Sequence, residues 1–375
     1  RLTDFDEKGG WAANGRITAK LADFGTVTLA GNTSKPGFGS IEKKVNERSQ
    51  EDIYQYDLST NLDLGKFFPA KSGVRIPMYF GYSEGFINPE YNPLDPDIPF
   101  KVTMDDPDIT KEEKDSIKNI SQDYTSRKSI NFTNVQINKS QGKPKIIDVS
   151  NFAVSYSYVE TKSHNINTEY NNRKKYRGAL TYNYNGNPKN IKPFKNSKLL
   201  KPKAFKLIKD FNFNLLPSQI SFMTDMNRDY NEKKMRNISN PNILISPTYD
   251  KNFIWNRIYD IRYNLTRTLK VNFSANNHSR IDEPDGLVNK DSTYSYNHWK
   301  DSVMSNIKRF GRNTQYHHDF NINYQIPIRK IPFLDWINAN LQYSGTYDWA
   351  AGPITADTIE LGNNIKNSNT AQINT

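Results

Sequence analysis

The chain has 375 residues, of which 35% are hydrophobic and 24% charged, and its formal net charge is +11. Its 22 Tyr and 20 Phe exclude a disordered segment, because such segments are poor in aromatic side chains. No run approaches the roughly 18 consecutive apolar residues of a transmembrane helix, which excludes a helical membrane protein. A transmembrane β-barrel remains compatible, since its strands are only half apolar.

Cysteine is absent from the sequence, so thiolate metal sites and disulfides are excluded. The basic residues are scattered among Asn and Tyr, and we expect clusters such as Arg173 to Arg177 to be solvated loop and strand-end charge rather than a nucleic-acid site. The sequence opens at Arg1 and stops within an alternating pattern, and we interpret it as part of a longer protein.

Alternation of apolar and polar residues with period two recurs along the chain and predicts an all-β, antiparallel fold of about twelve strands. Most of these strands have the ~9–11 residues that a tilted strand needs to cross a bilayer. In chain order they cover residues 11–22, 24–32, 52–64, 73–82, 149–160, 174–185, 207–216, 218–227, 254–266, 268–277, 315–326 and 335–350, and a further strand begins near Ala371.

The two parities of each strand predict two faces, because successive side chains of a strand point in opposite directions. The apolar parity is expected to face lipid, with Tyr and Trp near strand ends at the headgroup level. This lipid-facing set comprises Tyr54, Tyr56, Leu58, Leu62, Leu64, Phe152, Val154, Tyr259, Ile261, Tyr263, Phe320, Ile322, Leu341, Tyr343 and Tyr347. The set expected to face a water-filled lumen comprises Gln55, Asp57, Asn61, Asp63, Asn256, Asp260, Asn321, Asn323, Asn338 and Gln342.

The connections between the predicted strands alternate in length, which is typical of outer-membrane barrels with short turns on one side and long loops on the other. The chain is therefore predicted to be one segment of a large barrel, residues 1–375, with extramembrane excursions at 83–148 and 278–314. Residues Ser129 to Asn138 resemble a strand, but counting them as a membrane crossing breaks the alternation. We therefore place them within the 83–148 excursion.

Helices are predicted only in the long connections. Thr110 and Glu113 form a capping-box pattern ahead of an apolar pair. Asp301, Val303, Ile307 and Phe310 form a short amphipathic turn that ends at Gly311.

Candidate sites for chemistry are weak. His317 and His318 are adjacent, so a strand would point them to opposite faces, which is poor geometry for one metal. The glycine-rich segment 31–39 lacks the Gly-Lys-Ser/Thr ending of a P-loop and is interpreted as a hairpin loop. Acidic turns at 282–285 and 95–97 lack the ligand set of an EF-hand loop. We predict no catalytic residue, no cofactor and no metal site, and therefore no enzyme.

Five stretches in chain order are similar to the SprA (Sov) family, the outer-membrane translocon of the type IX secretion system of Bacteroidota. They are Leu21–Pro69, Gly81–Phe100 (GYSEGFINPEYNPLDPDIPF), Pro217–Glu232 (PSQISFMTDMNRDYNE), Arg280–Gly286 (RIDEPDG) and Ile326–Trp336 (IPIRKIPFLDW). The resemblance implies a segment of a very large single-chain barrel in the cell outer membrane, which conducts folded cargo proteins and in some members supports gliding motility. It also implies the partners: cargo with C-terminal secretion signals, a PorV-type barrel protein, a periplasmic plug protein and membrane lipids.

Two other classes stay open from the residues alone. A TonB-dependent receptor or large porin would share the barrel and carry a small molecule instead of a protein. A secreted glycan-binding β-sandwich would bury its aromatic faces against each other and be soluble. If the chain is a barrel segment, its open edges and apolar surface predict that it aggregates in water when isolated.

Overall fold

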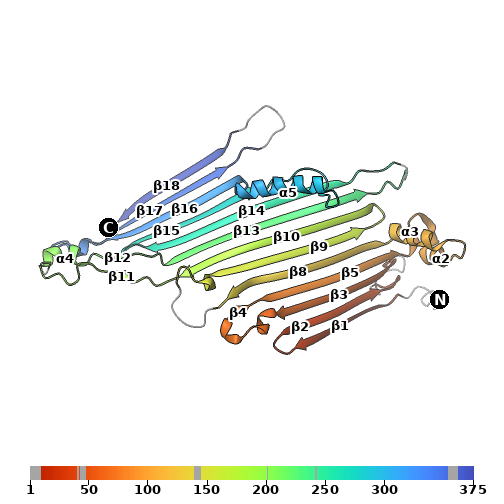
Figure 1. Cartoon of the computed structure of the whole chain (residues 1–375), viewed down its shortest axis with the longest axis horizontal. Coiled ribbons are helices and arrows are strands. Elements are labelled where there is room, and N and C mark those ends of the chain that lie inside the picture. The colour runs from red at the N-terminus through yellow and green to blue at the C-terminus, as the bar shows by residue number, and fades with distance from the viewer. Residues whose placement is uncertain are drawn as a thin grey trace.

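A 14-stranded antiparallel sheet forms the body of the chain in the computed structural model (Figure 1), confirming the predicted all-β fold. The structure describes residues 10–39, 42, 48–138, 145–200, 202–240, 243–353 and 362–375. Strands make up 55% of the fold and helices 15%. Within the described part of the chain, no helix is long and apolar enough to cross a membrane.

Each long strand pairs with the next long strand in the chain, so that the sheet is a meander with β1 and β18 at its two edges. The long strands are β1 (Ala12–Leu21), β2 (Gly25–Ser34), β3 (Glu51–Asp63), β5 (Pro77–Pro89), β8 (Asp123–Ile137), β9 (Phe152–His164), β10 (Thr168–Asn185), β13 (Gln219–Met235), β14 (Thr248–Asn264), β15 (Leu269–Arg280), β16 (Arg312–Ile326), β17 (Ala339–Ala350) and β18 (Asn364–Asn374).

Short elements occupy the connections. The short strands are β4 (Val74–Arg75), which pairs with β8, and the two small hairpins β6 (Tyr91–Asn92) with β7 (Asp95–Pro99) and β11 (Asn190–Ile191) with β12 (Phe213–Asn214). The helices are α2 (Phe100–Asp105), α3 (Lys111–Ser121), α4 (Lys206–Lys209) and α5 (Thr293–Lys308), with 3-10 turns at Leu64–Phe67, Ala70–Ser72, Val149–Asn151, Lys203–Phe205 and Ile328–Lys330. Figure 1 shows α4 beyond one end of the sheet, α2 and α3 beyond the other, and α5 along the strands.

Local chemistry explains the tightest turns. Between β9 and β10, the Asn165 side chain accepts hydrogen bonds from the backbone N–H groups of Asn167 (3.1 Å) and Thr168 (2.8 Å), an Asx-turn. Between β14 and β15, the Thr266 hydroxyl accepts from Thr268 (3.1 Å) and Leu269 (2.8 Å) in the same way. In these turns the side chains accept backbone hydrogen bonds that a neighbouring strand would accept within the sheet.

Both predicted loop helices are present. Thr110 and Glu113 form the capping box at the start of α3. The second helix, α5, ends as expected before Gly311, whose φ is 72° and whose N–H donates to the carbonyl of Asn306 at 2.8 Å. It begins at Thr293, well before the expected start, with the Ser292 side chain as its N-cap.

Residues 129–138, predicted to lie in the 83–148 excursion as an extramembrane strand or an extension beyond the bilayer, do not form such an excursion. Residues 129–137 belong to β8, which pairs with β5 from Met78↔Phe132 to Ile87↔Asp123 and on its other side with β9. The excursion predicted at 83–148 therefore reduces to connections 90–122 and 138–151, and the loop predicted at 278–314 to 281–311. Alternating loop length was the wrong criterion, because the backbone of β8 finds partners on both sides.

The strand predicted over 207–216 is also wrong. Residues 206–209 form α4 and only Phe213–Asn214 pair, as β12 with β11. This error compensates for the missing β8 in the count of about twelve strands, and the other eleven predicted strands all overlap long strands of the sheet. With the true strands, tight turns lie at both ends of the sheet, 22–24 and 265–268 at one and 165–167 at the other, and so do long connections.

Candidate functional site

The sheet has one apolar face and one polar face along its whole width. Residues paired directly across antiparallel strands share a face, so the register carries the parity of each strand to the next. In β3, Leu58 pairs with Tyr82 of β5 on one face, and Asp57 pairs with Ser83 on the other. Following the pairs from β1 to β18 keeps the two sets separate at every step.

All strand residues of the expected lipid-facing set lie on the apolar face, and those of the expected lumen-facing set lie on the polar face. The exceptions are two residues outside strands, Leu64 in a 3-10 turn and Asn338 just before β17. The apolar face is built from pairs such as Phe152–Tyr182, Tyr158–Tyr176 and Phe222–Tyr259, with ring centroids 4.9, 5.0 and 5.1 Å apart. Which solvent each face contacts stays a prediction.

The apolar face is bare over most of its area. Tyr56, Val154 and Tyr156 are 56%, 48% and 44% exposed, although each lies within a strand flanked on both sides by other strands. Exposed apolar surface on this scale marks contact with another apolar phase or another molecule.

The polar face carries charges that neutralise one another. Arg177 of β10 forms a two-fold ion pair with Asp225 of β13, both contacts at 2.9 Å, and Arg173 pairs in the same way with Asp229. Lys175 lies 3.6 Å from Asp229 as well. Between β10 and β13, the cations of one strand are therefore matched by the carboxylates of the next.

The two adjacent histidines point to opposite faces, as predicted. On the polar face, His317 lies between two carboxylates, with Nδ1 2.6 Å from Asp348 and Nε2 2.9 Å from Asp319. On the apolar face, His318 stacks on Tyr347 with ring centroids 5.3 Å apart. Among the described residues no group of three or more His, Cys, Asp or Glu could hold a metal ion.

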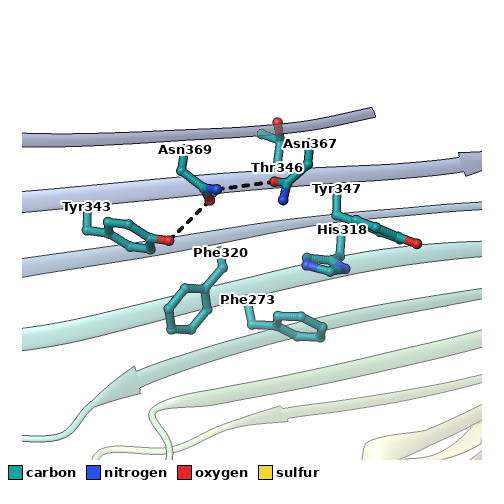
Figure 2. Close-up of a pocket in the computed structure, with 9 residues that line it drawn as sticks. Phe273, His318, Phe320, Tyr343, Thr346, Tyr347, Asn367 and Asn369 are labelled. Atoms are coloured by element: carbon teal, nitrogen blue, oxygen red, sulfur yellow. Dashed lines mark hydrogen bonds between the residues drawn. The ribbon is translucent and has the colours of Figure 1, made fainter. Parts of the chain in front are cut away.

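A notch interrupts the apolar face at Gly345 of β17 (Figure 2). It has a volume of about 430 Å³, and aromatic side chains including Phe273, Phe320 and Tyr343 form its walls. At the edge strand β18, Tyr343 donates to Asn369 at 3.1 Å, so that this corner of the apolar face holds amides as well as rings. The notch has no counterpart among the predicted site residues beyond the membership of Phe320, Tyr343 and Tyr347 in the apolar set.

A row of charged side chains crosses the apolar face toward the end where α2 and α3 lie. It runs through Glu84 of β5, Lys128 of β8, Glu160 of β9 and Lys174 of β10, with Lys174 3.9 Å from Glu160. Beyond this row β10, β13 and β14, which are 18, 17 and 17 residues long, continue with mixed side chains. On β5 to β10, the apolar band therefore ends at the row.

On β14 to β16, α5 covers part of the apolar face, level with the bare band of the earlier strands. Phe253 and Trp255 of β14 pack with Ile281 and with Val303 of α5 into the small buried core of the structure, and Trp299 packs against them. This is where the described chain has a conventional protein interior. Its position on the apolar face shows that the β14 part of the face is covered by the chain itself.

An ion pair attaches the connection 281–311 to the sheet. The Glu283 carboxylate, 2% exposed, accepts from Arg228 Nε and Nη2, both at 2.7 Å, and from Trp299 Nε1 at 2.7 Å. Next to it, Arg312 donates to Asp282 at 2.7 and 2.9 Å and holds the pKa of that carboxyl below its usual value. The acidic turn 282–285 is thus an anchor, as its two leading carboxylates bind arginines. Sequence reasoning missed this role, because the two arginines are distant in the chain.

The comparisons with known proteins concern mainly the first part of the chain. A family model described as SprA_N, motility related/secretion protein, matches residues 1–104. A search of the curated proteins finds no match. The matched residues hold β1, β2, β3 and β5, the first four long strands of the two-faced sheet, and the predicted resemblance is confirmed for this part of the chain.

Proposed function

We propose that the chain forms part of the wall of a large outer-membrane pore that conducts folded proteins, and the premise is the match of residues 1–104 to the family model SprA_N, motility related/secretion protein. The family description supports a role in motility or secretion. The proposal adds the membrane, the pore and the cargo.

The two-faced sheet carries the proposal. An antiparallel sheet with one apolar and one polar face is stable when each face meets a matching solvent, and in a soluble protein the apolar face would be covered by a second layer. Here it is bare from β1 to β9, where Ile17, Tyr56 and Val154 are 72%, 56% and 48% exposed. Lipid is the solvent that matches a bare band of Leu, Ile, Val, Phe and Tyr, and the long strands of 10 to 18 residues reach or exceed the roughly 9–11 needed to cross a bilayer.

The polar face suits the lining of a wide pore. A small barrel fills its interior with packed side chains, whereas a wide one leaves its interior wet. The amides, hydroxyls and paired ions of this face attract water and leave few unmatched charges or apolar groups. A folded protein sliding past such a surface would find little to bind.

The resemblance in the remaining stretches extends the proposal to type IX secretion. The transported molecules would be proteins with C-terminal secretion signals, and the partners a PorV-type barrel protein and a periplasmic plug protein. In some members the same pore would support gliding motility. The protein family is a secretion and motility family and not an enzyme family, and we propose no catalytic role for the chain.

Cysteine scanning of β3 in the full-length protein in cells tests the wall. Single cysteines from Tyr54 to Leu62 would be exposed to a membrane-impermeant maleimide and to a lipid-soluble probe. We expect even positions to react from lipid and odd positions from water. Val102 of α2, 58% exposed and beyond the end of the sheet, supplies a control position that should react from water only. Even positions that fail to react with the lipid probe while the control behaves as stated would refute the membrane wall.

Leucine substitutions on the polar face test transport. Changing Gln55, Asp57, Ser59 and Asn61 together to Leu should slow secretion, because cargo would bind the new apolar surface. Asp63 is spared because its carboxylate accepts from the backbone N–H of Gly65 and so holds the turn after β3. The matched control places four Leu between α2 and α3. Normal secretion by a correctly inserted polar-face variant would refute the hydrated-lining argument.

A further inference from the structure

The two ends of the sheet differ in charge. The longest connection at the end near α4, residues 186–218, contains eight Lys and one Asp. The longest at the opposite end, 90–122, contains nine acidic residues and four Lys. The neighbouring connections 64–76 and 327–338 add further Lys and Arg to the first end, which we call the basic rim: connections 64–76, 186–218, 265–268 and 327–338.

The connection 186–218 is attached to the turns of the basic rim. The N–H of Asn214 donates to Leu265 at 2.9 Å, and the Asn212 side chain accepts from the N–H of Arg267 at 3.0 Å. Farther along, Lys330 lies 3.3 Å from Asp210. The connection is therefore fixed across the ends of β14, β15 and β16, where Figure 1 shows α4, β11 and β12.

Between this connection and the strand ends lies a groove of about 1070 Å³. The connection contributes Phe194, Leu207, Ile208 and Phe211, which are between 41% and 49% exposed. The four side chains are ordered against the rim but only half covered.

The groove continues the apolar face. Leu269, Tyr324 and Ile326, which line it, belong to the apolar parity of β15 and β16. A hydrocarbon chain lying on the bare apolar band would reach the groove without crossing a polar surface.

Three cations lie at the groove: Lys192, Arg267 and Lys330. Lys330 is paired with Asp210, while Lys192 and Arg267 have no carboxylate partner within the described part of the chain. Apolar walls with cations among the lining residues suit an amphiphile with an anionic head and a hydrocarbon tail.

We propose that this groove binds an anionic phospholipid, with an acyl chain against Leu207, Ile208 and Phe211 and the phosphate at Lys192, Arg267 and Lys330. The inference rests on the proposed membrane wall, because continuity with lipid selects a lipid over an acidic peptide as the occupant. It assigns the basic rim to the surface of a phospholipid leaflet. Lipid bound there would anchor the end of the wall at the level of the headgroups.

Lipid titration of the full-length protein tests the groove. The detergent-purified protein would be titrated with phosphatidylglycerol and with phosphatidylcholine of the same acyl chains, and bound lipids counted by native mass spectrometry. We expect phosphatidylglycerol to bind more tightly and one site to dominate. Equal binding of the two lipids overturns the proposal.

Variants locate the site. Lys192→Gln, Arg267→Gln and Lys330→Gln should each weaken phosphatidylglycerol binding about fivefold, from the ~1 kcal/mol that one Lys or Arg contributes near an anionic surface. The matched controls, Lys101→Gln, Lys111→Gln and Lys118→Gln at the acidic end, should leave it unchanged. Ile208→Trp, which fills the groove, should reduce binding of both lipids. Equal effects of rim and control variants overturn the site.

Two further results would overturn the proposal in separable ways. Tighter binding of phosphorylated lipid A than of phosphatidylglycerol would assign the rim to a different leaflet. Displacement of the lipid by an acidic peptide, but not by excess phosphatidylcholine, would assign the groove to a protein. Failure of the cysteine scan in β3 would remove the membrane wall itself, whereas equal lipid binding with a positive scan removes only the groove.

Discussion

The attachment of α5 to the sheet depends on one buried carboxylate, and its removal gives a quantitative prediction. In Glu283→Ala, Arg228 would keep its charge at a site where its side chain is only 15% exposed, and Trp299 would lose its acceptor. Breaking a buried pair by removing one partner costs about 3–5 kcal/mol. Because the cost falls on the connection 281–311 and not on the strand ladders, we expect α5 to detach locally while the sheet persists.

Hydrogen–deuterium exchange of the full-length protein in detergent measures this detachment. A loss of about 3 kcal/mol corresponds to roughly a 100-fold faster exchange of the α5 amides, with β13 and β14 unchanged. The control Asp291→Asn removes an exposed carboxylate from the same connection and should have no effect. The double variant Arg228→Met with Glu283→Leu should recover most of the protection, since an apolar pair replaces a buried ion pair at little cost. Unchanged α5 exchange in Glu283→Ala would refute the assigned role of the carboxylate.

Three further predictions follow from the geometry. Arg312 lowers the pKa of Asp282, so the stabilisation is complete above the ordinary value of 3.8 and is lost as the pH falls through the lowered value. Hydrogen exchange of the amides in 281–311 should therefore rise at acid pH by a smaller factor in Asp282→Asn than in the wild type. An equal rise in the two proteins would contradict the stabilising role of the Arg312–Asp282 pair. Gly73→Ala places a methyl group 1.9 Å from the carbonyl oxygen of Asn138 at a φ of 65°, and should cost at least about 1–2 kcal/mol in thermal unfolding. Gly178→Ala, which meets nothing within 4 Å, should cost less. The isolated chain should aggregate in water and become monodisperse in detergent; a soluble monomer without detergent would argue for a covered apolar face.

Period-two alternation was sufficient to predict the sheet and the assignment of residues to its faces. Tyr54, Leu58 and Leu62 share a face because strand geometry alone requires it, and no tertiary information is needed. The cross-strand register then brings separate strands into agreement, since a slip of one residue would mix Leu58 with the polar set.

Loop positions required information that alternation does not contain. Residues 207–216 carry Phe211, Phe213 and Leu215 at strand spacing, but Leu207, Ile208 and Phe211 also share a helical face, and Asn212 binds the β14–β15 turn instead of a neighbouring strand. In the first half of β8, the positions on the apolar face are Tyr124, Ser126 and Lys128, so only the second half of the strand resembles a membrane strand. The structure of 207–216 and the position of β8 in the sheet both depend on residues distant in the chain, as does the pairing of Arg228 with Glu283.

The order of the strands in the sheet has a consequence for how such a wall is built. Among the long strands, each pairs only with those that come before and after it in the chain, so the contacts of the main sheet join consecutive strands. Assembly of such an array proceeds by adding hairpins one after another, with a small loop-closure cost at each step. Inserting or deleting a hairpin changes only the strand pairings next to it and leaves the other strand pairings intact. A pore wall with this strand order is able to change its circumference one hairpin at a time, without changes in the sequences of its remaining strands.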